Sequence, residues 1–190
     1  TVPSSPPGDG RTHPMEIGMA RGTWILALVV ALSGGGAAEP VVLVTSFVEA
    51  PGGELSRVST SAGRWTAEPG PAVIDTKHSR TGTRCLHLLG GETRTVELEL
   101  PAAGDDVHQL TFWAERWTRR APFAFRVLRL SRGRWREIYS GDAQITVGGS
   151  DTRVVIPRLD RPKRIRFTCT SPSGVLIDDV RLDRAVAMTV

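Results

Sequence analysis

Residues 109–117, QLTFWAERW, alternate apolar and polar side chains in the pattern of a β-strand. Successive side chains of a strand point to opposite faces of a sheet, so Leu110, Phe112 and Ala114 share one face. We expect this apolar face to pack in a core. The opposite face, which we expect to point outward, carries Thr111, Trp113, Glu115 and Trp117.

Similar short runs occur on both sides of this stretch, and clusters of Gly, Pro, Asp and Ser separate them. Helical periodicity is nearly absent after Pro40. Eight or nine short strands in about 150 residues predict an all-β fold, a two-sheet jelly-roll β-sandwich of antiparallel strands. The clearest runs are residues 84–89, 95–100, 109–117, 123–130, 134–140, 153–156, 164–170 and 175–182.

The first 38 residues differ in composition from the rest of the chain. Residues 24–32, WILALVVAL, form an unbroken apolar run, with Arg21 before it and the small residues 33–38, SGGGAA, after it. These are the three regions of a secretory signal peptide, and the run is shorter than the roughly 18 residues of a membrane-spanning helix. We therefore expect upstream residues and a signal peptide in 1–38 and one domain in 39–190. The protein would be secreted, periplasmic or on the cell surface, without a stable membrane span.

The composition is that of a globular domain with a positive charge. Of the 190 residues, 40% are hydrophobic and 23% charged, and the formal net charge is +4. A basic chain can bind nucleic acid, but the expected export argues against that partner. One arginine-rich segment could bind single-stranded nucleic acid or an acidic glycan, or could form a solvated face. Its members are Arg116, Arg119, Arg120, Arg126, Arg129, Arg132, Arg134 and Arg136.

One acidic residue falls within an apolar strand pattern. In residues 175–182, VLIDDVRL, a period of two places Leu176, Asp178 and Val180 on one side. An ionised carboxylate on an apolar face is costly unless it is paired or bound to a metal. Ca²⁺ takes carboxylate and carbonyl oxygens, and Glu49 is the candidate partner acid. The alternative is that both acids lie at strand ends, in solvent or beside arginine.

Two of the expected strands carry aromatic and acidic residues on the face away from the core. Residues 113–117 read WAERW, and residues 135–139 read WREIY. Aromatic rings stack on the apolar faces of sugar rings, and neighbouring charged groups bind hydroxyls. If the two strands are neighbours, their rings form one platform; alternatively the rings pack under a loop or in the core. The candidate carbohydrate-binding residues are Trp113, Glu115, Trp117, Trp135 and Tyr139.

Several short motifs occur in an order that carries a family resemblance. An acid follows the first strand in residues 47–49 (FVE), and a Trp follows in residues 63–65 (GRW). A turn and strand come next in residues 78–86 (HSRTGTRCL), and the order ends with residues 177–180 (IDDV). This order resembles the β-jelly-roll, galactose-binding-domain-like carbohydrate-binding modules attached to secreted glycoside hydrolases. It is similar in particular to the domain ahead of the catalytic propeller in some exported bacterial sialidase-like proteins.

The resemblance implies a structural Ca²⁺ held by Glu49, Asp178 and the backbone carbonyl of Thr83. It also implies a glycan partner, acidic glycans included, and a downstream catalytic propeller domain. Two positions depart from the family pattern. Cys85 stands where a small residue is usual, and the early acid occurs in Phe-Val-Glu rather than Phe-Glu.

No nucleophile-elbow, zinc-protease or phosphate-loop motif occurs in the sequence. Nothing marks a catalytic pair among the carboxylates of Glu97, Glu99, Glu115 and Glu137. We therefore predict a non-catalytic module that binds carbohydrate or docks a neighbouring glycosidase domain. The alternatives are a structural or protein-interaction β-sandwich with no sugar site, and a hydrolase of an unrecognised type.

The two cysteines leave a further question open. An oxidising compartment would allow Cys85 and Cys169 to form one disulfide. The alternation places Cys169 on the face of Phe167, however, and Cys85 on the face opposite Leu86. If both faces are assigned correctly, the two sulfur atoms do not meet.

Overall fold

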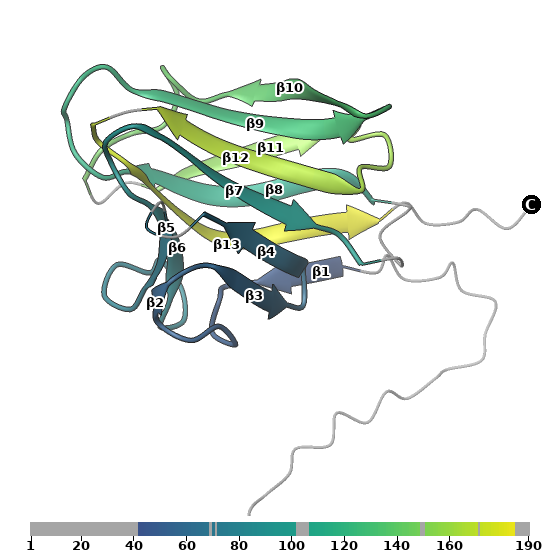
Figure 1. The fold of residues 1–190 in the computed structure, drawn as a ribbon, viewed down its shortest axis with the longest axis horizontal. Coiled ribbons are helices and arrows are strands. Elements are labelled where there is room, and N and C mark those ends of the chain that lie inside the picture. The colour runs from purple at the N-terminus through teal and green to yellow at the C-terminus, as the bar shows by residue number, and fades with distance from the viewer. Residues whose placement is uncertain are drawn as a thin grey trace, which may run out of the picture. The chain divides into compact units, whose positions relative to one another are not determined.

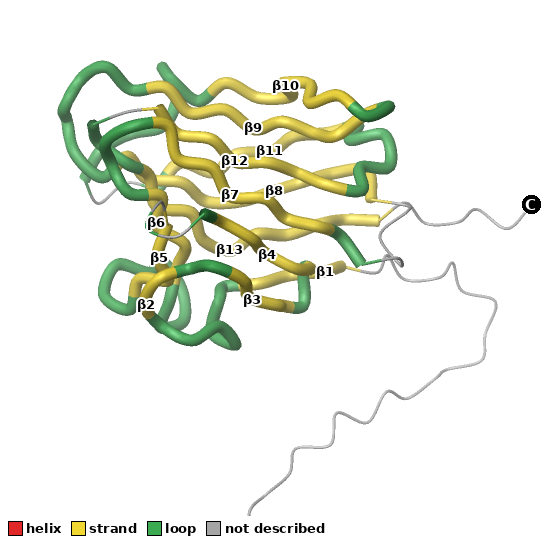
Figure 2. Tube along the Cα trace, in the orientation of Figure 1, coloured by secondary structure: helices red, strands yellow, loops and turns green. Residues whose placement is uncertain are grey.

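Strands are the regular elements of the computed structural model in the residues that it describes, which are 42–68, 70, 72–101, 107–148, 151–170 and 172–184 (Figures 1 and 2). The predicted signal peptide, residues 1–38, lies outside these residues. Within them there is no helix with the length and apolar character needed to cross a membrane.

Seven strands form the larger sheet: β1 (Val42–Thr45), β2 (Gly53–Glu54), β5 (Ala72–Asp75), β6 (Cys85–Leu88), β8 (Val107–Arg116), β11 (Thr152–Pro157) and β13 (Val175–Arg184). Their order is β11-β8-β13-β6-β5-β2, and β1 also pairs with β13. Pairing is antiparallel throughout this sheet.

Six strands form the smaller sheet: β3 (Arg57–Thr60), β4 (Gly63–Ala67), β7 (Thr93–Glu99), β9 (Ala124–Ser131), β10 (Arg134–Ser140) and β12 (Arg164–Thr170). Their order is β10-β9-β12-β7-β4-β3, again with antiparallel pairs. The two sheets lie face to face (Figure 1). The predicted all-β antiparallel sandwich is therefore confirmed.

The predicted number of strands, eight or nine, was too low. Five short strands, β1 to β5, lie in residues 42–75, and each has between two and five residues. A pattern with a period of two cannot be recognised in so few residues. These strands are identified only by the neighbouring strands with which they pair.

Apolar side chains from the inner faces of both sheets form the core. Leu110, Phe112 and Ala114 are buried there, as the alternation in β8 predicts. Trp65 of β4 is also fully buried, and its ring lies 5.0 Å from that of Phe47, measured between centroids. The core is thus continuous from the first strands to the last.

A β-bulge interrupts β13. Asp178 pairs with Trp113 of β8, but the next paired residue, Arg181, lies opposite Thr111. Two residues of β13 therefore stand opposite one residue of β8, which is the geometry of a bulge. Asp179, within the bulge, has a left-handed φ of 49°.

The bulge changes which side chains of β13 face the core. The core cluster contains side chains from both sides of the bulge: Val175, Ile177, Val180 and Leu182. Leu176 is buried outside that cluster, and Asp178 follows it on the same outer face. The prediction that Asp178 shares a face with Val180 was wrong, because the extra residue shifts the alternation.

The two cysteines are free and lie in different sheets. Cys169 of β12 is part of the core, whereas Cys85 of β6 is buried outside the core cluster. The expectation from alternation, that they do not meet, is confirmed.

Candidate functional site

The segment of residues 76–84, which joins β5 to β6, is bonded to the outer face of the larger sheet through Asp178. One carboxylate oxygen, Oδ2, accepts hydrogen bonds from the backbone N–H groups of Arg80 (2.8 Å) and Thr81 (3.0 Å). The other, Oδ1, accepts one from the N–H of Asp179 (2.7 Å). Asp178 is only 4% exposed. Burial raises the pKa of Asp178 to about 6, although these N–H donors act to lower it.

Glu49, the other predicted calcium ligand, has its own partners. Its Oε1 accepts hydrogen bonds from the N–H of Ser61 (3.0 Å) and from the hydroxyls of Ser61 (3.2 Å) and Thr45 (3.3 Å). Burial acts to raise the pKa of Glu49, but these bonds outweigh it and hold the pKa below its ordinary value. The hydrogen bonds of Glu49 and Asp178 share no partner.

The backbone carbonyls on either side of Glu49 accept hydrogen bonds from the guanidinium group of Arg84. Arg84 donates to the backbone oxygens of Val48 (2.7 Å) and Ala50. Thr83 lies exposed in the turn before β6. Ca²⁺ takes six to eight oxygen ligands, whereas the described residues contain no group of three His, Cys, Asp or Glu side chains that could hold a metal. The proposed site has two such side chains and one backbone carbonyl, and calcium binding by Glu49, Thr83 and Asp178 stays a prediction.

The structure separates the predicted aromatic platform into two parts. Trp113, Glu115 and Trp117 lie on or next to β8 in the larger sheet, whereas Trp135 and Tyr139 lie on β10 in the smaller sheet. The two strands are not neighbours, so the condition for one shared platform is not met. Sequence alternation reveals the face of a strand but not the sheet to which it belongs.

Two of the predicted rings are covered by arginines. The guanidinium carbon of Arg80 lies 3.7 Å from the ring centroid of half-buried Trp113. That of Arg166 lies 3.9 Å from the ring centroid of Trp135. In each case a cation–π contact occupies one face of the ring. Glu115 of β8 is half-buried, and in the strand register it lies opposite Leu176 of β13.

Tyr139 packs toward the core rather than outward. A second bulge, between Glu137 and Tyr139, shifts the register of β10 against β9. The Tyr139 ring contacts Phe112 and Phe125, each at 6.4 Å between centroids. Burial raises the pKa of Tyr139, and its hydroxyl has no hydrogen-bond partner among the described residues. This residue therefore follows the packing alternative considered for the sequence.

Trp117 is the most exposed of the predicted rings, at 39%. It lies over two histidines, with centroid distances of 4.7 Å to His78 and 4.7 Å to His87. Asp75 Oδ2 is 3.0 Å from Nδ1 of His78 and 3.8 Å from Nδ1 of His87. His87 is buried, and its Nε2 has no hydrogen-bond partner in the described part of the chain.

This cluster predicts a dependence of stability on pH. Burial lowers the pKa of His87 below its ordinary value of 6.5, and Asp75 opposes this only in part. The unfolded chain therefore binds the His87 proton more tightly than the folded chain, so stability is present above pH 6.5 and is lost as pH falls through the folded-state pKa. The His87 contribution to the free energy of unfolding should therefore fall between pH 7.5 and pH 5. Asp178, whose pKa burial raises to about 6, contributes with the opposite sign in this window, so the effect of His87 is measured as a difference between variants. The pKa of Asp75 is held below its ordinary 3.8, so its titration lies outside this window.

Urea denaturation followed by tryptophan fluorescence at several pH values measures this effect. His87→Gln should lose less free energy of unfolding between pH 7.5 and pH 5 than the wild type does, whereas His108→Gln, a change at an exposed histidine, should follow the wild type. Equal slopes in the wild type and His87→Gln would contradict the assignment.

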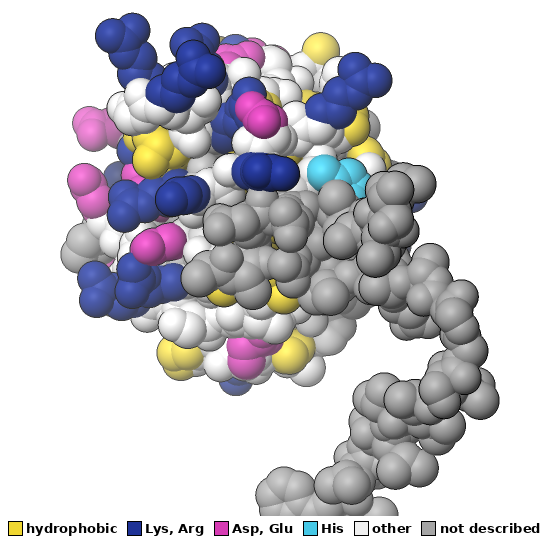
Figure 3. Space-filling view, turned by 90° about the vertical axis from the view of Figure 1, so that its right-hand side faces the viewer, with side chains coloured by type: hydrophobic (Ala, Val, Ile, Leu, Met, Phe, Trp, Pro, Cys, Tyr) yellow, Lys and Arg dark blue, Asp and Glu magenta, His cyan; other side chains and the backbone are white. Residues whose placement is uncertain are grey.

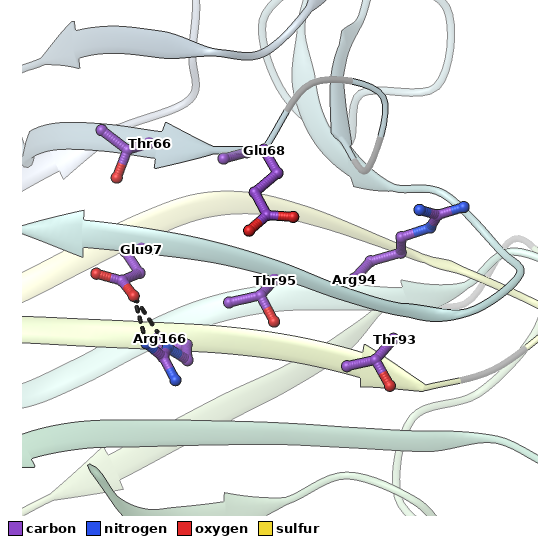
Figure 4. Close-up of a pocket in the computed structure, with 8 residues that line it drawn as sticks. Thr66, Glu68, Thr93, Arg94, Thr95, Glu97 and Arg166 are labelled. Atoms are coloured by element: carbon purple, nitrogen blue, oxygen red, sulfur yellow. Dashed lines mark hydrogen bonds and ion pairs between the residues drawn. The ribbon is translucent and has the colours of Figure 1, made fainter. Parts of the chain in front are cut away.

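A hollow of about 530 Å³ lies on the outer face of the smaller sheet (Figure 4). Side chains from the neighbouring strands β4, β7 and β12, together with the residue after β4, line it: Thr66, Ala67, Glu68, Thr93, Arg94, Thr95, Glu97 and Arg166. Strand register places Glu97 between Thr66 and Arg166, so these side chains form a row across the three strands.

An ion pair forms one side of the hollow. Arg166 Nε donates to Oε1 of Glu97 at 3.1 Å, and a second guanidinium nitrogen contacts the same oxygen. Figure 4 shows the Glu68 carboxylate extending from the end of β4 toward β7. Arg94 Nε is buried and has no hydrogen-bond partner in the part of the chain that the structure describes. The hollow therefore presents donors and acceptors side by side.

The sequence did not indicate this hollow. In the sequence, Glu97 is one of four carboxylates among which nothing marks a catalytic pair, and no pattern singles out Arg166. The two are 69 residues apart, and the antiparallel register of β7 and β12 brings them together. The available signal was the charge on the outward positions of both strands, which does not reveal that they pair.

No family model and no curated protein matches the chain. Solved structures with a similar arrangement include the carbohydrate-binding module TmCBM61 in complex with β-1,4-galactotriose, at 18% identity and a TM-score of 0.42, covering 64% of this chain and 88% of that one. A mutant of the family 29 module CBM29-2 complexed with mannohexaose has 11% identity and a TM-score of 0.47, covering 76% and 92%. The CBM22-1-GH10 modules of Clostridium thermocellum xylanase 10B, complexed with xylohexaose, have 11% identity and a TM-score of 0.47, covering 73% and 30%. Likeness at TM-scores this low does not decide what this chain binds.

Proposed function

We propose that this chain is a non-catalytic carbohydrate-binding module that binds a glycan in the hollow between β4, β7 and β12. The observation that carries the proposal is the lining of that hollow. Three threonine hydroxyls, two carboxylates and two guanidinium groups line a volume of about 530 Å³. Sugar hydroxyls both donate and accept hydrogen bonds, and hollows of roughly 300–1,000 Å³ are typical of small-ligand sites.

The central charges of the hollow are held in place before any ligand arrives. The Arg166 guanidinium is fixed by Glu97 on one side and by the ring of Trp135 on the other. Preorganised side chains lose little conformational entropy on binding, which favours affinity. Hydrogen bonds to charged groups contribute about 1.5–3 kcal/mol each. A glycan that hydrogen-bonds to Glu97 and Arg166 should therefore bind much more weakly when both side chains are removed.

The double substitution Glu97→Ala with Arg166→Ala tests this site. It removes both charges together, so neither is left unpaired. We expect at least a tenfold loss of affinity on a glycan array and in calorimetry with the best glycan, since tenfold is about 1.4 kcal/mol. The matched control is Arg64→Ala with Glu99→Ala, an exposed ion pair on the same sheet that does not line the hollow.

Trp117→Ala tests the aromatic site predicted from the sequence on the other sheet. Loss of binding in this variant, with full binding in the Glu97 and Arg166 double variant, would move the site to the larger sheet. A folded wild type that binds no glycan would instead favour the alternative of an interaction domain without a sugar site.

The wider proposal concerns the protein around this module. The apolar run 24–32 supports export, to the medium, the periplasm or the cell surface. The order of short motifs from residue 47 to residue 180 supports a parent that is a secreted glycoside hydrolase with a sialidase-like propeller. The reading frame beyond Val190 tests the parent, because a propeller sequence there is the expected result.

A further inference from the structure

Five exposed cationic side chains lie on two loops at one end of the sandwich: Arg132, Arg134, Arg158, Arg161 and Lys163. Arg132 lies in the turn between β9 and β10, Arg134 is the first residue of β10, and the others belong to the loop between β11 and β12. We call these five residues the basic end. Figure 3, which faces this end, shows Lys and Arg side chains over its upper part with only isolated acidic groups between them.

Strand pairing brings the two loops together. Ile165 pairs with Arg129, which places Lys163 level with the end of β9. The Arg129 guanidinium donates to the carbonyl of Leu159 (2.5 Å) and pairs with the carboxylate of Asp160 (3.1 Å). The β11–β12 loop is therefore fastened to β9, next to the β9–β10 turn.

Buried side chains on the β11–β12 loop set the direction of its charges. Leu159 and Pro162 are buried, and the Leu159 N–H donates to the carbonyl of His108 (2.9 Å). With these two positions facing inward, Arg158 and Arg161 remain exposed. The cations are thus presented by an anchored loop.

The backbone of these loops adopts a costly conformation. Six described non-glycine residues have a positive φ, and four of them lie here: Arg132 (50°), Arg158 (58°), Asp160 (54°) and Arg161 (51°). Each such residue costs about 1–2 kcal/mol relative to the right-handed region, and glycine would avoid the cost. Backbone strain of this kind concentrates at functional sites.

The charges of the basic end have no ion pair with a described residue, whereas other arginines do. Arg126 pairs with Asp142 and with Glu137. The carboxylate of Asp160, on the same loop as Arg158 and Arg161, pairs with Arg129 instead. Like charges that are close together repel, and an anionic partner would relieve this repulsion.

We infer that the basic end binds a linear anionic polysaccharide, at a site separate from the proposed glycan hollow. Arginine forks match the geometry of sulfate and carboxylate groups. Proteins that bind single-stranded nucleic acid add exposed rings on which bases stack. The ring next to the basic end, Trp135, already lies against Arg166, and the exposed Trp117 follows the opposite end of β8.

Binding of the full chain to dextran sulfate, with neutral dextran as the uncharged control, tests the inference. The test variant combines Arg132→Asn, Arg158→Asn and Arg161→Asn, because asparagine tolerates a positive φ and the fold should persist. We expect at least a tenfold loss of affinity at about 0.1 M salt. The slope of log affinity against log salt should become shallower by roughly two.

A charge-matched variant separates local from overall charge. Arg57→Asn, Arg119→Asn and Arg120→Asn also remove three exposed cations, all outside the basic end, and should change the affinity less than threefold. Equal losses in the two triple variants would overturn the inference. Tighter binding of the wild type to single-stranded DNA than to dextran sulfate would also overturn it. The Glu97 and Arg166 double variant should bind dextran sulfate normally, so the glycan hollow can fail its own test independently.

Discussion

Trp65→Ala is expected to lower the free energy of unfolding by about 4 kcal/mol. The Trp65 side chain is fully buried, between the rings of Phe47 (5.0 Å) and Phe167 (5.7 Å). Its indole N–H donates to the hydroxyl of Thr60 at 3.0 Å. Alanine would leave a cavity between the two sheets and remove the hydrogen bond that Thr60 accepts, although the Thr60 hydroxyl still donates to the carbonyl of Gly63 (3.3 Å). Since domains are stable by about 5–15 kcal/mol, this one change would remove a large part of the total.

Thermal and urea denaturation measure this loss, which corresponds to a fall in Tm of roughly 10 °C for a domain of this size. Trp65→Phe keeps one ring in the core, so its free energy of unfolding should lie between those of the wild type and Trp65→Ala. Trp117→Ala is the matched control, because it removes the same side chain from a site that is 39% exposed. Similar destabilisation at the two positions would contradict the central place of Trp65 in the core.

Asp178→Ala should lower the free energy of unfolding by about 3 kcal/mol, through a different mechanism. The carboxylate accepts three backbone N–H groups, those of Arg80, Thr81 and Asp179. Removing an acceptor from buried donors costs about 1–3 kcal/mol for each donor that water does not reach. We expect the segment of residues 76–84 to detach from the sheet, which hydrogen exchange at the Arg80 and Thr81 amides would detect.

The neighbouring acid provides the control for Asp178. Asp179 bonds to the side chains of Arg80 and Thr81 and is only half-buried. Asp179→Asn retains a side chain that tolerates the left-handed φ and should cost less than about 1 kcal/mol. A larger loss in Asp179→Asn than in Asp178→Ala would contradict this account.

Thermal denaturation with and without Ca²⁺ separates the hydrogen-bonding role of Asp178 from its predicted role as a calcium ligand. If the N–H donors alone account for its burial, EDTA should leave the Tm of the wild type unchanged, and Asp178→Ala should be equally destabilised with and without Ca²⁺. A rise in the Tm of the wild type on adding Ca²⁺, absent in Asp178→Ala, would support the calcium site instead.

What could be predicted of this protein from the sequence is local. The period of two in residues 109–117 identified Leu110, Phe112 and Ala114 as core residues and predicted the sheet architecture. This succeeds because the pleat of a strand alone determines which side chains share a face. The same reasoning failed in β13, where one extra residue at Asp179 shifted the alternation and moved Asp178 away from Val180.

Which strands and loops become neighbours was decided only by the tertiary structure. Trp113 and Trp135 carry similar local patterns but belong to different sheets. Glu97 meets Arg166 across 69 residues, and Asp178 holds the backbone of Arg80 across 98. Strand register and loop packing depend on the free energy of the whole core. They therefore cannot be predicted from a window of a few residues.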